Sequence, residues 1–187
     1  MDNLLIEKNL QLLGDLMDLE KTPSIRLVVS GGAALMARGF VARVTNDVDI
    51  IAIREWEGDL EAAYPLPEWF LEITARIGSQ GDLSENWLNA ATSLVFPDLF
   101  RLLPPHSWTD LDEMSFGERL RVAYLGRIAQ MHLKAYALVN RDEARDLDDF
   151  RSLTPTVEEI ERVSAWLMEN QLASSLTVTK FKNLVTE

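Results

Sequence analysis

Two aspartates separated by one residue are the clearest candidates for chemistry in this chain. Asp47-Val48-Asp49 begins a mostly apolar run, residues 47–53, that reads as a β-strand. Alternate strand residues point to the same side, so both carboxylates should face one way, about 7 Å apart. Two such carboxylates can bind Mg²⁺, which prefers oxygen ligands and usually completes its coordination with substrate phosphates. The alternative is a pair of solvent-facing acids, because acidic side chains are mostly exposed.

A glycine pair precedes the aspartates and adds a second candidate feature. Gly31-Gly32 directly follows the apolar run 25–30, which ends at Ser30, and directly precedes a short helical pattern. Glycine lets the backbone approach a ligand closely, and the start of a helix presents free N–H groups that suit phosphate. An ordinary strand-to-helix turn is the other interpretation. The order of strand, Gly-Gly, helix and Asp-x-Asp strand is more specific than either motif alone.

The elements that position these residues follow from hydrophobic periodicity and turn signals. The predicted strands are residues 25–30, 47–53 and 119–125. Strict alternation in the second strand puts Ile51 with the aspartates and Ala52 on the opposite side. The predicted helices are 3–20, 33–38, 67–77, 127–139, 143–153, 157–169 and 175–185.

Two stretches between these elements are harder to assign. Residues 87–96 fit either a helix or a strand, and the proline-containing loop at 103–106 continues as irregular structure through 117. Thr156 and Glu159 have the spacing of a capping box at the start of a helix. The sequence predicts an α/β (α+β) fold in which a small mixed sheet, within residues 1–125, precedes a helical part, 126–187, packed on it as one structural unit.

Four residues near the end of the chain predict a basic face on one helix. Lys134, Leu138, Arg141 and Arg145 lie on the same side if that helix continues beyond Asn140. Such cations could bind a triphosphate or the backbone of an acceptor. Ion pairs with neighbouring acids are the alternative, and the stretch supplies several, Asp142, Asp146, Asp148 and Asp149.

Composition excludes several classes of protein. The chain has 187 residues, 47% hydrophobic, with 30 acids against 18 bases and a formal charge of −12. A uniformly basic nucleic-acid footprint is therefore absent, although a local basic stripe could still bind nucleic acid. There is no cysteine, which excludes disulfides and cysteine-ligated zinc. No apolar run or signal peptide points to a membrane or to secretion, so we expect a cytoplasmic protein.

Together these motifs resemble a known signature. Ser30-Gly31-Gly32 followed by Asp47-Val48-Asp49 is similar to the nucleotidyltransferase superfamily pattern, and the segment RVTNDVDII resembles minimal nucleotidyltransferases of abortive-infection and toxin–antitoxin systems. A second block, from Leu133-Lys134-Ala135 through Arg141 to Arg145-Asp146-Leu147-Asp148-Asp149-Phe150, is similar to their Lys-x-x-Ala … Arg … Arg-Asp-x-x-Asp helix pair. Trp87-Leu88-Asn89 also matches a recurring Trp-Leu-Asn. The resemblance covers residues 25–168.

The resemblance implies a nucleotidyltransferase-like core and a role for each matched residue. The turn Ser30-Gly31-Gly32 would cradle a nucleoside triphosphate, and Asp47 and Asp49 would be catalytic and hold Mg²⁺ or Mn²⁺. Lys134 and Arg141 would contact phosphate. Asp146 or Asp149 would orient a cation or position the acceptor, so all four belong to the expected nucleotide-binding residues.

The implied reaction moves a nucleoside monophosphate from an NTP to a protein, RNA or small-molecule acceptor. The resemblance also suggests a toxin-like role with a cognate antitoxin protein. A third carboxylate normally completes such sites on a neighbouring strand, yet the strand predicted to carry it, 119–125, has no acid. Glu118 stands just before this strand, and Glu72 and Asp98 could supply the acid only if the strand assignment is wrong. Without a third acid, the alternative is an inactive nucleotidyltransferase fold that binds nucleotides or proteins.

Overall fold

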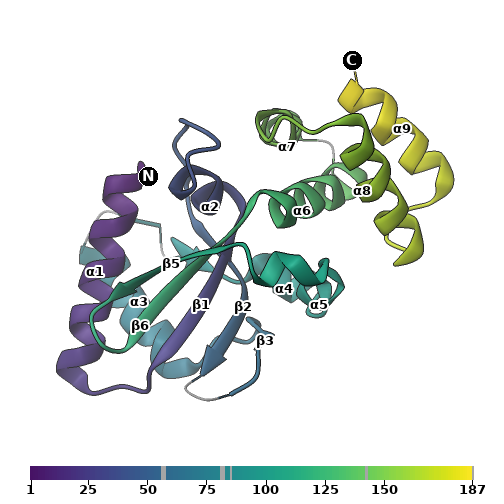
Figure 1. Cartoon of the computed structure of the whole chain (residues 1–187). Coiled ribbons are helices and arrows are strands. Elements are labelled where there is room, and N and C mark those ends of the chain that lie inside the picture. Colours follow the sequence, from purple (N-terminus) through teal and green to yellow (C-terminus); the bar gives the residue numbers. More distant parts are fainter. Residues whose placement is uncertain (56–57, 81–82, 85, 142, 187) are drawn as a thin grey trace. The chain divides into compact units, whose positions relative to one another are not determined.

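The chain forms two compact units in this computed structural model, Met1–Gly126 and Arg127–Glu187, and each is described by itself (Figure 1). The structure describes residues 1–55, 58–80, 83–84, 86–141 and 143–186. The first unit contains a mixed sheet and the second is helical, so the predicted mixed α/β class is confirmed. The packing of the helical part on the sheet part stays a prediction.

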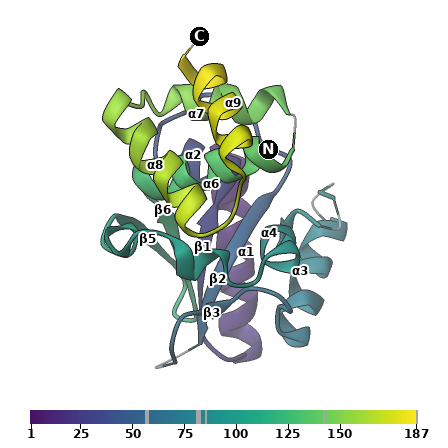
Figure 2. The ribbon, with the colours of Figure 1, turned by 90° about the vertical axis from the view of Figure 1, so that its right-hand side faces the viewer.

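The described residues of the first unit form a six-stranded sheet with β1 near its centre (Figure 2). Its strands are β1 (Ile25–Ser30), β2 (Val48–Glu55), β3 (Glu61–Ala62), β4 (Leu88–Asn89), β5 (Leu111–Phe116) and β6 (Leu120–Leu125). The order is β3-β2-β1-β6-β5, and β4 pairs separately with β2. The strand β1 runs antiparallel to β2 and parallel to β6. This arrangement puts the turn after β1 beside the start of β2.

Among the described residues of this unit, the helical segments are α1 (Asn3–Glu20), α2 (Gly31–Ala37), α3 (Glu68–Gln80), α4 (Ala91–Val95), α5 (Leu99–Leu102) and the 3₁₀ helix η1 (Pro105–Trp108). The side chain of Asp2 caps α1 by accepting a hydrogen bond from the N–H of Leu5 at 2.8 Å. A polar cap of this kind satisfies one of the free N–H groups at a helix start.

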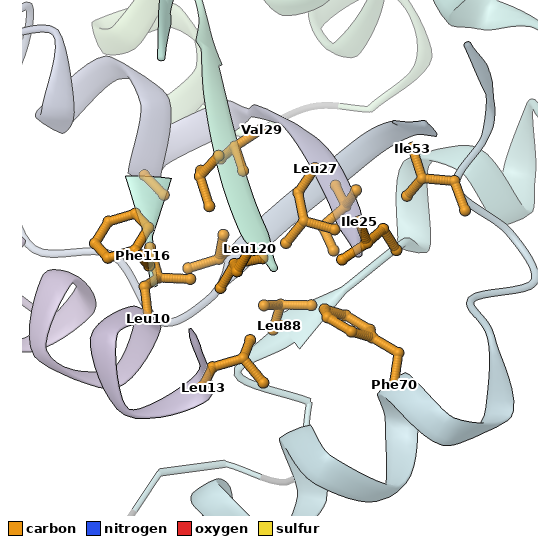
Figure 3. Close-up of a cluster of buried hydrophobic side chains, with 14 of the residues drawn as sticks. Leu10, Leu13, Ile25, Leu27, Val29, Ile53, Phe70, Leu88, Phe116 and Leu120 are labelled. Carbon is orange, nitrogen blue, oxygen red and sulfur yellow. The ribbon is translucent and has the colours of Figure 1, made fainter. Parts of the chain in front are cut away.

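One face of the sheet packs on α1 and α3 through a shared apolar core (Figure 3). The core-facing residues of β1 are Ile25, Leu27 and Val29, and those of β6 include Leu120. All are buried, and so is Phe70 of α3. Burial of such side chains stabilises the fold by roughly 1.5–3 kcal/mol each, which fixes the sheet on which the candidate site lies.

The strand β2 departs from strict alternation where its pairing with β1 shifts register between Val28 and Val29. Val28 pairs with Ala52 and Val29 pairs with Ile50, so Ile51 is an extra residue of the bulge type. Asp49 therefore lies on the same side as Ala52. The predicted separation of these two residues onto opposite faces is wrong, because alternation is interrupted between them.

The second unit consists of α6 (Arg127–Asn140), α7 (Ala144–Ser152), α8 (Val157–Glu169) and α9 (Ser175–Thr186). The predicted capping box at the start of α8 is confirmed, with Thr156 and Glu159 bonding reciprocally to each other's backbone N–H. The predicted continuous basic face is wrong. The helix α6 ends at Asn140 and Arg145 belongs to α7, so no single helix carries all the cations.

Two stretches of the first unit differ from expectation. The ambiguous segment 87–96 divides into β4 and α4, so both interpretations apply to part of it. The stretch predicted to be irregular through 117 contains η1 and the strand β5. The inner residues of β5 are largely exposed polar or charged groups, so it lacks the apolar pattern that identifies a buried strand. Among the described residues, no helix combines the length and apolar character needed to cross a membrane.

Candidate functional site

The glycine turn after β1 lies beside Asp49, near the start of β2. Ser30 pairs with Asp49 in the antiparallel register, so the residue that ends β1 lies directly beside the second aspartate. Gly31 follows with φ of +66°, a conformation that favours glycine. A Cβ atom added to Gly31 would lie 2.6 Å from Oδ2 of Asp49. The backbone angle therefore favours glycine at position 31, and a side chain there would also displace the carboxylate of Asp49.

The second glycine lies against two residues from the segment before β2. A Cβ atom at Gly32 would lie 2.8 Å from Oγ1 of Thr45 and 3.2 Å from Nη2 of Arg43. Thr45 is 4% exposed, and its hydroxyl donates to the carbonyl of Asp47 at 3.2 Å. The guanidinium of Arg43 and the buried hydroxyl of Thr45 therefore lie beside the turn. The same hydroxyl bonds to the backbone of Asp47.

Asp47 receives a hydrogen bond from a residue of β4, which pairs with β2. The side-chain amide of Asn89 donates to Oδ2 of Asp47 at 3.2 Å. Asn89 lies in β4, in parallel register beside Asp49, and its Oδ1 accepts from the N–H of Ala91 at 2.9 Å. This asparagine thus orients one carboxylate of the pair while its own acceptor is engaged with the start of α4.

The strand predicted at 119–125, from which a third acid was expected, is β6 and does not lie beside β2. In the sheet order, β6 lies beyond β1 and is no neighbour of β2. At the level of Asp49 the residue on the other side of β2 is Asn89. Among the described residues, no group of three histidine or acidic side chains is close enough together to hold a metal ion.

The carboxylate pair nevertheless suits Mg²⁺ when a phosphate ligand is included. Asp47 immediately precedes β2 and Asp49 lies within it; both are partly exposed and offer the hard oxygen atoms that Mg²⁺ prefers. One or two carboxylates with substrate phosphates are a usual protein contribution for this ion. The two aspartates fit a site of that kind.

The other predicted site residues gather in the helical unit. Nζ of Lys134 lies 2.7 Å from Oδ1 of Asp146 and 2.7 Å from Oδ2 of Asp149. Arg141 adds two bonds to Asp146, from Nε at 2.7 Å and from Nη2 at 3.2 Å. The side chain of Lys134 is 8% exposed and those of the two aspartates are each 1% exposed. These four side chains, from α6, α7 and the residue after α6, therefore form an ion cluster around two buried carboxylates.

The bonds in this cluster keep its central carboxylate ionised. Burial alone would raise the pKa of Asp146, but hydrogen bonds and charge from Arg141 and Lys134 outweigh it and hold the pKa below its usual range. A second pair in the same unit behaves similarly. The hydrogen bond from Arg127 is the main cause that lowers the pKa of Glu159 to about 2.

The predicted site residues thus form two groups. Ser30, Gly31, Gly32, Asp47 and Asp49 come together in the sheet unit, and Lys134, Arg141, Asp146 and Asp149 come together in the helical unit. Whether the groups act on one ligand stays a prediction.

Sequence reasoning assigned no role to three residues beside the first group, Arg43, Thr45 and Asn89. Each stood inside a segment that matched the nucleotidyltransferase pattern, and that was the available signal. Comparison of the chain with protein-family models, with curated proteins and with solved structures finds no match.

Proposed function

We propose that this protein is a nucleotidyltransferase-like enzyme that moves a nucleoside monophosphate from an NTP to an acceptor. The acceptor hydroxyl would form a bond to the α-phosphorus and lose its proton, while the bond between the α- and β-phosphates breaks and pyrophosphate leaves. Asp47 and Asp49 would bind Mg²⁺ or Mn²⁺. The bound ion would neutralise phosphate charge during the transfer.

One observation carries the proposal. The left-handed turn at Gly31 lies against Asp49, so a strand-ending glycine pair and a carboxylate pair on the adjacent strand occupy one place. Neither motif is informative alone, as each has an ordinary structural explanation. Their spatial coincidence supports a site where phosphate approaches the turn and the carboxylates carry its counter-ion.

The surrounding residues have matching roles in this proposal. Arg43, whose guanidinium lies beside Gly32, would contact a phosphate oxygen, because arginine forms strong charge-assisted hydrogen bonds with phosphate. Asn89 would hold Asp47 in the orientation needed for ion binding. Thr45 would fix the backbone before β2 through its bond to the carbonyl of Asp47.

The proposal extends to partners and setting as the resemblance implies them. The acceptor would be a protein, an RNA or a small molecule, and a cognate antitoxin protein would restrain a toxin-like activity. The reaction would take place in the cytoplasm, where NTPs are available. A phosphate-binding role for Lys134 would require it to bind a ligand while it retains Asp146 and Asp149, its partners in the cluster.

Labelled nucleotides test the reaction directly. The full chain is incubated with cell extract, Mg²⁺ or Mn²⁺, and NTPs labelled at either the α- or the γ-phosphate. We expect the α-label, and not the γ-label, to move to an acceptor, and Asp47→Asn to abolish the transfer. Transfer of the γ-label would indicate a kinase instead, and equal transfer by Asp47→Asn would remove the aspartate pair from the mechanism.

Asn89 favours a second candidate, a nucleotide-binding module without catalysis. A neutral amide stands beside the pair where an acid would strengthen ion binding. On this alternative, NTP and Mn²⁺ bind together but no label is transferred. The label assay distinguishes the candidates, since only an active enzyme moves the α-label to an acceptor.

A further inference from the structure

Three arginines stand in register across three neighbouring strands of the sheet. Arg26 of β1 pairs with Arg54 of β2 on one side and with Arg121 of β6 on the other. Residues paired across strands point to the same face, and adjacent strands lie about 4.8 Å apart. The arginine row, Arg54–Arg26–Arg121, therefore runs perpendicular to the strands and spans about 10 Å.

The electrostatic repulsion within this row is unfavourable for the stability of the sheet. Like charges placed directly opposite each other destabilise a sheet. Glu113 of β5 offsets part of the repulsion, with Oε2 lying 2.5 Å from Nε of Arg26 and Oε1 lying 3.9 Å from Nη1 of Arg121. Arg54 instead donates from Nε to the carbonyl of Gly58 at 2.6 Å. Three cations thus remain concentrated on one part of a chain whose formal charge is −12.

The row is open to solvent and shares a face with the candidate site. The side chains of Arg26 and Arg121 are 27% and 51% exposed, and Arg54 is exposed. On β1 the residues that alternate with the apolar core are Arg26, Val28 and Ser30, and Ser30 pairs with Asp49. Ser30 lies four positions after Arg26 along the strand, about 13 Å away at the usual rise per residue.

We propose that the arginine row binds the phosphate backbone of a single-stranded nucleic acid. A guanidinium presents a fork of N–H donors that matches phosphate oxygens, and it keeps its charge at any physiological pH. A row of such groups fits a ligand with one negative charge on every unit, whatever its sequence. A single strand suits the row better than a duplex, because a second strand would bring further phosphates toward an acidic protein.

The proposal goes beyond the transfer reaction and does not rest on it, since binding to the row requires neither NTP nor metal. Its measurable signature is salt dependence. For single strands, the logarithm of the binding constant falls with the logarithm of salt concentration with a slope of about −0.7 for each phosphate neutralised. Three arginines therefore predict a slope of about −2 for a labelled twelve-residue oligouridine or oligothymidine, measured by fluorescence anisotropy with the full chain.

Charge-removing variants locate the binding. We expect Arg54→Gln and Arg121→Gln each to weaken binding and to reduce the slope by about 0.7. Arg76→Gln is the matched control, because Arg76 lies on α3, is 49% exposed and is paired with Glu20 at 2.7 Å. An unchanged slope in both row variants, or an equal reduction in the control, would overturn the proposal.

Glu113→Gln gives a result of opposite sign that a purely structural role does not predict. Removing this carboxylate takes away the negative charge beside Arg26 and Arg121, so oligonucleotide affinity should increase severalfold even as the melting temperature falls. If Glu113→Gln lowers the melting temperature and leaves affinity unchanged or weaker, the row is only structural. Competition by inorganic tripolyphosphate at equal phosphate concentration would identify a small-phosphate site, and preferential binding of polyglutamate an acidic-peptide site. Either outcome would overturn the nucleic-acid proposal.

Discussion

The two units treat their carboxylates in opposite ways. In the helical unit, Asp146 is 1% exposed and receives bonds from the cations of Lys134 and Arg141. In the sheet unit, Asp47 is only partly buried and receives a bond from the neutral amide of Asn89. The first carboxylate already has protein counter-charges, whereas the second is oriented and left accessible. The difference separates residues that hold the protein together from residues suited to an external cation.

Removing the shared cation of the helical cluster is expected to have the largest effect on stability. Lys134→Met deletes a charge that two carboxylates, each 1% exposed, both contact. Removing one partner of a buried ion pair costs about 3–5 kcal/mol, and Arg141 still contacts Asp146, so the free energy of unfolding in denaturant should fall by up to about that amount.

Lys182→Met is the control, since Lys182 pairs with Glu161 at the surface and should lose less than about 1 kcal/mol. A small loss in Lys134→Met together with a loss of NTP binding would instead support the phosphate role that the sequence suggested.

A glycine substitution probes the sheet-unit site. Gly31→Ala forces a side chain into a left-handed conformation, at a cost of about 1–2 kcal/mol, and brings its Cβ within 2.6 Å of Asp49. Gly39→Ala is the matched control, because Gly39 has φ of +73° with nothing within 4 Å of the added atom. We expect Gly31→Ala to lose more melting temperature, and the excess to disappear in an Asp49→Ala background. Equal losses at both glycines would separate the turn from the carboxylate.

Acid titration should reveal the paired carboxylates of the helical unit. The pKa of Glu159 is lowered from 4.5 to about 2, so its stabilising contribution is complete above pH 4.5 and is lost as pH falls toward 2. Glu159→Gln keeps a side chain able to reach the N–H of Thr156 while it removes the charge. The unfolding free energy of this variant should therefore fall less steeply between pH 4.5 and 2 than that of the wild type. Parallel curves would contradict the assignment.

The smallest stability effect is expected at the accessible carboxylate. Asp47→Asn preserves volume and can still bond to Asn89 through its side-chain oxygen, so the unfolding free energy should change by less than about 0.5 kcal/mol. Mn²⁺-dependent NTP binding, measured by calorimetry, should be lost. A strongly destabilised Asp47→Asn variant would place this aspartate with the structural carboxylates and remove the contrast between the two units.

Local signals predicted the elements that local chemistry determines. The helix 3–20, the strand 25–30 and the helix 157–169 have the predicted bounds, because apolar periodicity and turn residues specify them within one segment. The glycine turn and the aspartate pair were recognisable for the same reason. Their proximity required two strands to pair, which the order of motifs suggested but did not define.

Features that depend on distant pairing were not predictable. The strand β5 has mostly exposed residues and lies at the sheet edge, so its sequence lacks an apolar pattern. The place of Asn89 depends on β4, a two-residue strand whose register only the folded sheet defines. The partners of Lys134 depend on the turn that ends α6, because a longer helix would have carried Arg141 and Arg145 away from Asp146.

The extra residue in β2 makes the length of this strand as important as its composition. Ile50 and Ile53 both belong to the core although three positions separate them, and Ile51 makes that spacing compatible with a carboxylate face at Asp49. If residues 49–53 alternated strictly without this bulge, Asp49 and Ile53 would share a side, so burial of Ile53 would turn Asp49 toward the apolar core. The side on which Asp49 lies is therefore set by one extra residue in the strand as well as by the side chains of β2.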